Sequence, residues 1–271
     1  MLYFCKKYGL IALRRIMYSV LGLFGWGWYA QAPYPVVLCY HSVNNDSWFY
    51  GITLAALEAQ LSWMAKRARP VTLSQIADHV SGKQPLIGPS FAVTFDDGYR
   101  NVLSVKDVAA KLGIQPTIFV LSNPLGANHT ELDNRYEFLD RDDILQLYEF
   151  GWEVGCHGAT HADFWSLSHD DAHREVVESK HLLERQLGLP IRYFAYPRGR
   201  YTDRVLEVVE SAGYELAFSM NDGTIQPGSN RFLLPRTGIN RTHALIEFKS
   251  SFTPPAVLLR KFIKRYVKNI I

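Results

Sequence analysis

Two adjacent carboxylates, Asp96 and Asp97, follow an apolar run at residues 91–95 and precede a glycine. An Asp-Gly step is a strong turn signal, so a plain turn is one interpretation. The chemical interpretation is that two carboxylates leaving a strand diverge. One then reaches a metal ion, and the other takes a proton from a bound water.

A second motif holds His157 and His161, four residues apart, at the end of the apolar run 152–156. Two imidazoles at this spacing can ligate one cation if the turn between them is helical. His169 and His173 have the same spacing, but they lie in a strongly polar stretch, and a solvated helix face explains them.

Asp97, His157 and His161 together make a set of two histidines and one carboxylate with an open coordination position. Open sites of this kind are catalytic rather than structural. Zn²⁺ or a similar divalent cation in such a set lowers the pKa of a bound water to roughly 7, and Asp96 is placed to accept its proton. The two motifs therefore predict a hydrolytic metal site.

A third motif, at residues 193–201, contains Tyr196, Pro197 and Arg198. A Pro-Gly turn that ends a core strand is the structural interpretation. The functional interpretation is a groove wall whose backbone N–H groups face an oxyanion and whose rings stack on sugars. Tyr99, two residues after Asp97, is a further candidate for contact with substrate.

These motifs stand in a pattern of short apolar runs that alternate with longer amphipathic ones, which is typical of repeated β-α units. We expect strands at residues 36–40, 91–95, 117–121, 152–156, 192–196, 215–219 and 233–238. Helices are expected at residues 54–65, 102–112, 141–150, 170–187 and 203–212. The pattern predicts an α/β fold with a parallel, distorted barrel whose chemistry follows the carboxyl ends of the strands.

Composition fits one globular catalytic domain, because 48% of the 271 residues are hydrophobic and 20% are charged. Three cysteines imply no disulfide framework. The segments 1–32 and 256–271 carry nine basic residues and no acidic one. Since the whole chain carries +3 and these ends carry +9, the residues between them carry −6, which argues against a nucleic-acid partner.

In this order the motifs resemble the polysaccharide deacetylases, carbohydrate esterases that share the nodulation-factor deacetylase domain, and among them the exopolysaccharide branch. The resemblance covers roughly residues 35–240. The matching segments are Leu38-Cys39-Tyr40-His41-Ser42-Val43, Thr94-Phe95-Asp96-Asp97-Gly98-Tyr99, Gln115-Pro116-Thr117-Ile118-Phe119-Val120, Cys156-His157-Gly158-Ala159-Thr160-His161, Phe194-Ala195-Tyr196-Pro197-Arg198-Gly199 and Leu234-Pro235-Arg236.

The resemblance implies a partial, distorted (β/α)7 barrel that uses zinc or a like divalent ion on N-acetylated sugars. It implies that Asp96 is the general base, that Asp97, His157 and His161 are the metal ligands, and that the Arg198 backbone N–H faces the oxyanion. The chain departs from the family pattern at three places. Gly158 stands where Ser or Thr is usual, Ala195 where many members have Arg, and no late Leu-x-His motif is evident.

The general acid is therefore to be sought elsewhere, and we favour His41 over His243. His41 ends the first expected strand and resembles a histidine that serves as the acid in the exopolysaccharide branch, whereas His243 lies near the expected place of the late motif. The expected activity is removal of N-acetyl groups from a polysaccharide or a lipid-linked oligosaccharide. The alternatives are an O-acetyl esterase, an N-deformylase on a sugar, or a catalytically impaired glycan-binding homologue.

We expect three parts: a basic and apolar segment at residues 1–34, the barrel at 35–250, and a basic amphipathic helix at 251–271. The apolar run 16–30 is shorter than the roughly 20 residues of a membrane-spanning helix. It also resembles a signal peptide that would be cut before Pro33. The ends predict an enzyme associated with a membrane surface, with the cytoplasmic face favoured and a periplasmic or secreted protein as the alternative.

Overall fold

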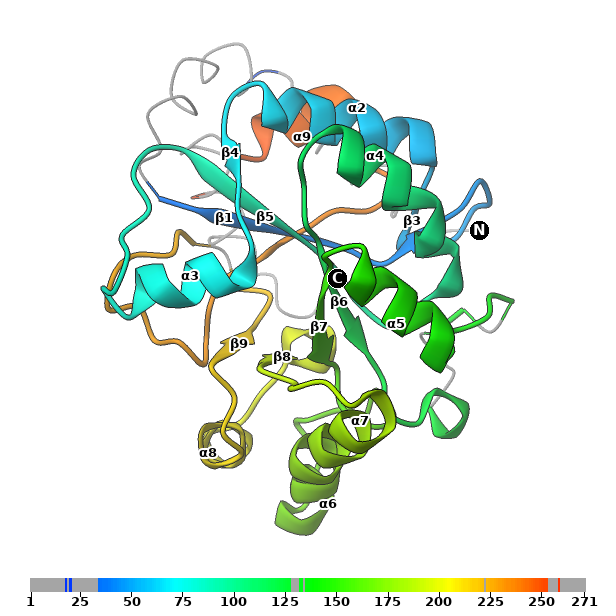
Figure 1. Cartoon of the computed structure of the whole chain (residues 1–271), viewed down its shortest axis with the longest axis vertical. Coiled ribbons are helices and arrows are strands. Elements are labelled where there is room, and N and C mark those ends of the chain that lie inside the picture. Colours follow the sequence, from blue (N-terminus) through cyan, green and yellow to red (C-terminus); the bar gives the residue numbers. More distant parts are fainter. Residues whose placement is uncertain are drawn as a thin grey trace, which may run out of the picture.

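The computed structural model describes residues 18, 20, 34–127, 132–133, 135–221, 223–252 and 258. Parallel strands occupy its centre and helices surround them (Figure 1). The sheet runs in the order β10-β1-β5-β6-β7-β8-β9, and β4 pairs with β5 off this path. The strands are β1 Val36–Tyr40, β4 Arg69–Pro70, β5 Ser90–Phe95, β6 Thr117–Val120, β7 Glu153–Cys156, β8 Tyr193–Ala195, β9 Leu216–Phe218 and β10 Thr237–Gly238.

The sheet curves back on itself through the segment that leads into β10. Leu234 forms a parallel bridge with Phe218 at the end of β9, and a few residues later β10 pairs with β1. Closure at this seam therefore rests on one bridge and a two-residue strand, so the barrel is distorted and incomplete there. This confirms the predicted fold class, a partial (β/α)7 barrel.

All seven expected strands are present, and six of them have ends within one residue of the predicted ones. The reason is that barrel strands are buried on both faces, so they read as short, almost continuous apolar runs. The strand expected at residues 233–238 is shorter, because only Thr237–Gly238 pairs as β10. A second sheet, which was not expected, pairs β2 (Ser42–Val43) with β3 (Gly51–Ile52).

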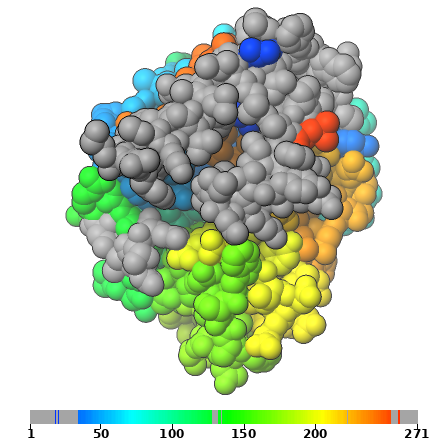
Figure 2. Space-filling model, turned by 180° about the vertical axis from the view of Figure 1, so that it is seen from behind, coloured from blue at the N-terminus to red at the C-terminus, as the bar shows by residue number. Residues whose placement is uncertain are grey.

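Helices cover the outside of the barrel. The helices that were expected are α2 Leu54–Ala65, α4 Lys106–Lys111, α5 Arg141–Glu149, α6 His169–His173, α7 Ser179–Leu187 and α8 Asp203–Ser211. A 3-10 turn at Arg100–Val105 precedes α4, and a π-helical turn at Arg174–Glu178 joins α6 to α7. In the view from behind, the chain around α6, α7 and α8, green to yellow, forms the lower end of the molecule (Figure 2).

Within the described part of the chain, the sequence prediction missed two α-helices, α3 (Leu73–Val80) and α9 (Leu245–Ser250). The signal for α3 was present, because Thr72 and Gln75 form a capping box at its start. A half-buried carboxylate also holds this start: Glu153, on β7, accepts hydrogen bonds from the backbone N–H groups of Leu73 and Ser74 at 2.7 and 2.9 Å. The helix thereby lies against the amino end of the barrel.

Side chains alternate between two cores along each strand. Val37 of β1, Ala92 of β5 and Ala195 of β8 belong to a core that also contains α3 residues, whereas their chain neighbours pack toward the outer helices. The first set therefore faces the barrel interior. Every second residue of a strand faces the same side. His41 therefore continues the inward-facing row of Val37, and Asp96 continues the row of Ala92.

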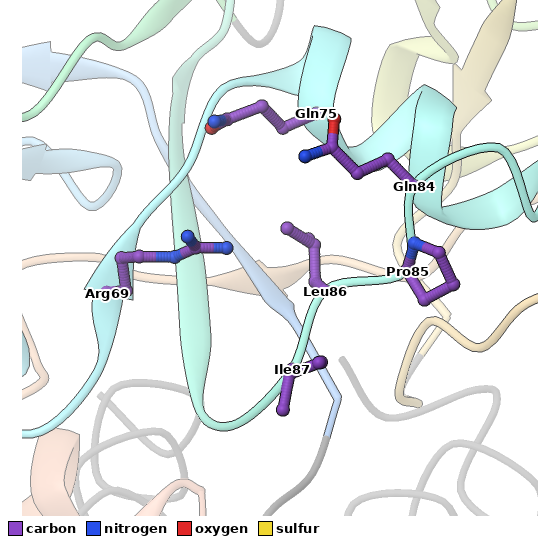
Figure 3. A pocket seen from close by; sticks show the side chains of 6 residues that line it. All are labelled: Arg69, Gln75, Gln84, Pro85, Leu86 and Ile87. Carbon is purple, nitrogen blue, oxygen red and sulfur yellow. The ribbon is translucent and has the colours of Figure 1, made fainter.

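A surface pocket lies at the amino end of the barrel (Figure 3). Its wall includes Arg69, which pairs with Ser90 at the beginning of β5, whereas Asp96 follows the end of that strand. The pocket is therefore distant from the predicted chemistry. It is lined by Arg69, Gln75, Gln84, Pro85, Leu86 and Ile87.

Most of both terminal parts lies outside the described residues, so the boundaries predicted at 34/35 and 250/251 stay predictions. Among the described residues, no helix combines the length and apolar character that crossing a membrane requires. The interpretation of His169 and His173 as members of a solvated face is confirmed, because their side chains are 67% and 50% exposed.

Candidate active site

Asp97, His157 and His161 converge at the carboxyl ends of β5 and β7. Asp97 Oδ1 lies 3.4 Å from His157 Nε2 and 3.6 Å from His161 Nε2. The three residues are 3%, 1% and 7% exposed, and one ligand atom of each lies within 4.8 Å of the other two. The structure therefore brings together the three residues that the sequence predicted as metal ligands.

The donor chemistry of this cluster fits a divalent cation. Asp97 Oδ1 is buried and has no hydrogen-bond partner among the described residues, although two imidazole nitrogens lie near it. Burial lowers the pKa of His161 to about 4, which favours the neutral imidazole that ligates metals. Three convergent donor atoms of nitrogen and oxygen are a set that suits zinc and related ions.

A backbone carbonyl orients His157. Its Nδ1 lies 2.7 Å from the carbonyl oxygen of Ala195 on β8, so Nδ1 carries the proton that is donated to that oxygen. The other ring nitrogen, Nε2, faces Asp97. This arrangement is the usual second-layer support of a metal-ligating histidine. Burial lowers the pKa of His157, but the carboxylates of Asp96 and Asp97 raise it above its usual value.

The chain does not reach this geometry through a helix. Asp97 and His161 have φ angles of 71° and 57°, in the left-handed region, and the residues between the two histidines form bends rather than a helical turn. The helical turn named as the condition for shared ligation is therefore not needed here. An irregular loop after β7 brings the two imidazoles together instead.

Asp96 forms a buried ion pair that the sequence did not reveal. Arg236 donates from Nη1 to Asp96 Oδ1 and from Nη2 to Oδ2, both at 2.7 Å, and the Cys39 thiol lies 3.4 Å from Oδ2. Burial raises the pKa of Asp96, but the Arg236 guanidinium, together with His157 and His41, holds that pKa well below its usual range. Asp96 is therefore a carboxylate, the form that can accept a proton.

Arg236 also accounts for one departure from the family pattern. Ala195 stands where many family members have an arginine, and here Arg236, directly before β10, contacts Asp96. The matching segment Leu234-Pro235-Arg236 was visible in the sequence, but the partner of Arg236 lies 140 residues away. Its function could not be predicted from local sequence.

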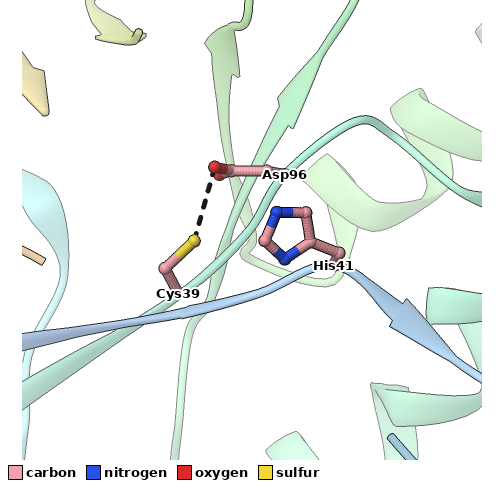
Figure 4. A group of neighbouring side chains, drawn as sticks. All are labelled: Cys39, His41 and Asp96. Carbon is pink, nitrogen blue, oxygen red and sulfur yellow. Dashed lines mark hydrogen bonds between the residues drawn. The ribbon is translucent and has the colours of Figure 1, made fainter. Parts of the chain in front are cut away.

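A second group of donor atoms, from Cys39, His41 and Asp96, lies beside the first (Figure 4). The Cys39 thiol points at the Asp96 carboxylate, and the His41 ring lies next to both. Both oxygens of this carboxylate are already held by Arg236, whose positive charge opposes a cation there. Burial also raises the pKa of the Cys39 thiol well above its usual range. The Asp97 group is therefore the better metal site.

The structure places His41, and not His243, beside the carboxylates. The charge of His41 contributes to lowering the pKa of both Asp96 and Asp97. His243 is held in a turn, where its Nδ1 lies 3.1 Å from the side-chain oxygen of Asn240. The preference for His41 as the general acid remains a prediction, with this proximity in its favour.

Three of the residues expected to contact substrate are buried. The Tyr196 ring packs against Phe164 and Phe194, and its hydroxyl donates to the carbonyl oxygen of Phe232 at 3.1 Å. Pro197 is buried as well. Stacking of a sugar on Tyr196 was therefore a wrong expectation, and the alternation of β8 explains it, because Tyr196 continues the outward-facing row.

Tyr99 is likewise buried, and its ring stacks on Phe138 with centroids 5.2 Å apart. Its hydroxyl oxygen accepts a hydrogen bond from the backbone N–H of Asp133 at 2.8 Å. Arg198 lies in the left-handed region with φ 59°, and Asp163 accepts a hydrogen bond from its Nη1 at 2.9 Å. The role of the Arg198 backbone N–H stays a prediction.

The chain is similar to known proteins in both sequence and structure. The family model described as "Polysaccharide deacetylase" matches residues 83–217. A protein of Staphylococcus epidermidis named poly-beta-1,6-N-acetyl-D-glucosamine N-deacetylase is 23% identical over 201 residues, which are 69% of this chain and 67% of that protein.

Two solved structures share the fold. The Streptococcus pyogenes deacetylase PplD, in complex with acetate, superposes with a TM-score of 0.70 at 20% identity and covers 82% of this chain and 100% of its own. IcaB from Ammonifex degensii superposes with a TM-score of 0.69 at 24% identity and covers 85% of this chain and 98% of its own.

Proposed function

Since the chain belongs to the polysaccharide deacetylase family, we propose that it removes N-acetyl groups from amino sugars of a polysaccharide or a lipid-linked glycan. Asp97, His157 and His161 would hold Zn²⁺ or a similar divalent cation. The observation that carries this proposal is the buried convergence of these three side chains beside an ionised Asp96.

When bound, the ion would polarise the acetyl carbonyl and would lower the pKa of the attacking water. Asp96, kept ionised by Arg236, accepts the proton of the attacking water as general base. His41, near the same carboxylate, donates a proton to the departing amine. The Arg198 backbone N–H donates to the oxyanion that forms on the acetyl carbonyl.

The substrate class rests on the relatives, together with the arrangement above. The Staphylococcus epidermidis protein is named for poly-beta-1,6-N-acetyl-D-glucosamine. We therefore expect a polymer or lipid-linked precursor that contains N-acetylated hexosamine. A net charge of −6 on the residues between the basic ends argues against nucleic acid as a partner.

The test is acetate release by the purified full chain from β-1,6-linked N-acetylglucosamine oligomers, from chitooligosaccharides and from an O-acetylated sugar. We expect release from an N-acetylated oligomer that stops on chelation and returns with Zn²⁺. Release from the ester alone would identify an O-acetyl esterase. Formate release from an N-formyl aminosugar, without acetate release, would identify a deformylase. Oligomer binding without any release would identify a glycan-binding homologue.

The proposal also places the enzyme at a membrane surface, with the cytoplasmic face favoured over a periplasmic or secreted location. Its support is the charge of the ends, since residues 1–32 and 256–271 carry nine basic residues and no acidic one. Basic residues next to an anionic leaflet contribute about 1 kcal/mol each. A lipid-linked substrate would fit such a location.

A further inference from the structure

The loop that carries both histidine ligands has a backbone path that needs support. Gly158 has φ 84° and His161 has φ 57°, so two of the five residues from His157 to His161 are in the left-handed region. For a non-glycine residue this region costs free energy, and it persists only where the surroundings hold it. Something outside the loop must therefore fix its shape.

Glu175 makes the contacts that do this. Its Oε2 accepts hydrogen bonds from the backbone N–H groups of Ala159 at 2.8 Å and Thr160 at 3.0 Å, and its Oε1 accepts from the Thr160 hydroxyl at 2.5 Å. The side chain is 7% exposed, so these three bonds form away from water. Bonds to a charged acceptor of this kind are about twice as strong as neutral ones.

The opposite side of the loop is held by the segment after β6. The backbone N–H groups of Ser122 and Asn123 donate to the carbonyl oxygens of Gly158 and Ala159 at 3.1 and 2.9 Å. Glu175 holds the N–H groups of the loop and this segment holds its carbonyls. Removal of the carboxylate would leave only one side of the loop fixed.

Gly158 is part of the same arrangement. A Cβ atom at this position would lie 2.9 Å from Glu175 Oε2, closer than real Cβ contacts allow. A side chain there would therefore displace the carboxylate. The departure from Ser or Thr at position 158 is explained by the close approach of Glu175, whose carboxylate is the acceptor that this loop uses.

The helix that carries Glu175 is locally widened. Residues Arg174–Glu178 form a π-helical turn between α6 and α7, and the Glu175 carbonyl accepts a hydrogen bond from the Ser179 hydroxyl at 2.5 Å. Single π turns inside α-helices occur frequently at functional sites. Here the turn is the place from which a buried carboxylate reaches the ligand loop.

We propose that Glu175 is a positioning residue for metal binding: it holds residues 158–160 so that His157 and His161 are arranged for the ion before the ion arrives. It acts only through the loop. The inference rests on the proposed metal site, and it adds a determinant of metal affinity outside the ligand set. Loss of such outer supports typically weakens metal affinity by about 10- to 100-fold.

The chain offers a matched control in Glu153. This carboxylate also accepts from two backbone N–H groups and one threonine hydroxyl, those of Leu73, Ser74 and Thr117. Glu153 lies at the amino end of β7, whereas the ligand loop follows the carboxyl end of that strand. Glu153→Ala removes the same kinds of hydrogen bond without touching the loop.

The experiment strips the full chain with a chelator and measures Zn²⁺ affinity by competition with a chromophoric chelator, alongside unfolding of the ion-free protein. We expect Glu175→Ala to bind about 10- to 100-fold more weakly than the wild type. Glu175→Gln should retain most of the affinity, because its amide oxygen can accept both backbone bonds. Glu153→Ala should bind like the wild type and lose only stability.

Wild-type affinity in Glu175→Ala, or equal losses in Glu175→Ala and Glu153→Ala, would overturn the inference. If Glu175→Ala does not fold, Thr160→Val decides, since it removes only the hydroxyl donor. Weaker binding by Thr160→Val supports the inference and unchanged binding refutes it. A wild-type chain that binds no ion would instead refute the metal site itself, and the inference with it.

Discussion

Asp96 and Asp97 are neighbours in sequence, yet they are placed for different tasks. Asp96 is paired with Arg236, whereas Asp97 faces two imidazoles. Asp96→Asn should therefore keep the metal ion and lose about two to four decades of rate, because a general base contributes that much. Metal content and acetate release of the same preparation test this. An unchanged rate would mean that another group is the base.

The two candidate acids can be separated by parallel substitutions. His41→Ala should lower the maximal rate and remove the alkaline limb of the pH-rate profile, since His41 lies beside the carboxylates. His243→Ala is the control, because the His243 ring is hydrogen-bonded to Asn240 in a turn and does not lie beside the carboxylates. The opposite pattern, with His243 needed and His41 dispensable, would reverse the assignment.

At the scale of the element, the loop after β7 depends on glycine at position 158. Gly158→Ala adds left-handed strain of about 1–2 kcal/mol and pushes against the Glu175 carboxylate. It should lower both the free energy of unfolding and the Zn²⁺ affinity.

Gly188, at the end of α7, is the matched control for this substitution. It has a φ of 69°, and nothing lies within 4 Å of a Cβ added there. Gly188→Ala should therefore lower stability by a similar strain term and leave Zn²⁺ affinity unchanged. Denaturant unfolding and competition titration of both variants test the pair. Equal affinity in the two variants would contradict the account of the loop.

The strands were predictable because their apolar runs end where polar chemistry begins. Asp96 directly follows β5 and His157 directly follows β7, and carboxyl ends of parallel strands meet at one edge of a barrel. The pattern of elements therefore predicted that the proposed metal ligands lie close together. It did not predict the backbone path of the loop after β7, since that path depends on contacts made by Glu175 from another element.

One error and one omission have a common physical origin. Tyr196 was misjudged and the partner of Arg236 was not foreseen, because the environment of each is set by distant chain segments. The alternation of side chains along β8 could have predicted that Tyr196 faces outward, because its neighbour Ala195 faces the interior. The 140-residue separation between Arg236 and Asp96 offered no such signal, since long-range ion pairs leave no periodic pattern.

At the scale of the whole molecule, charge is distributed unevenly between the ends and the barrel. The segment 256–271 carries five basic residues and no acidic one. The full chain should therefore sediment with anionic lipid vesicles at low salt, and a chain ending at residue 255 should sediment less. Vesicles of neutral lipid are the control. A full chain that stays in the supernatant with anionic vesicles would contradict membrane docking.

The most direct measurement for the central claim is the number of zinc ions bound per chain, with the acetate-releasing activity of the same samples. His161→Ala removes a proposed ligand, and His173→Ala removes a histidine of the same spacing from the exposed face of α6. We expect one ion and full activity in the wild type and in His173→Ala, and neither in His161→Ala. A His161→Ala protein with one bound ion and full activity would contradict the account.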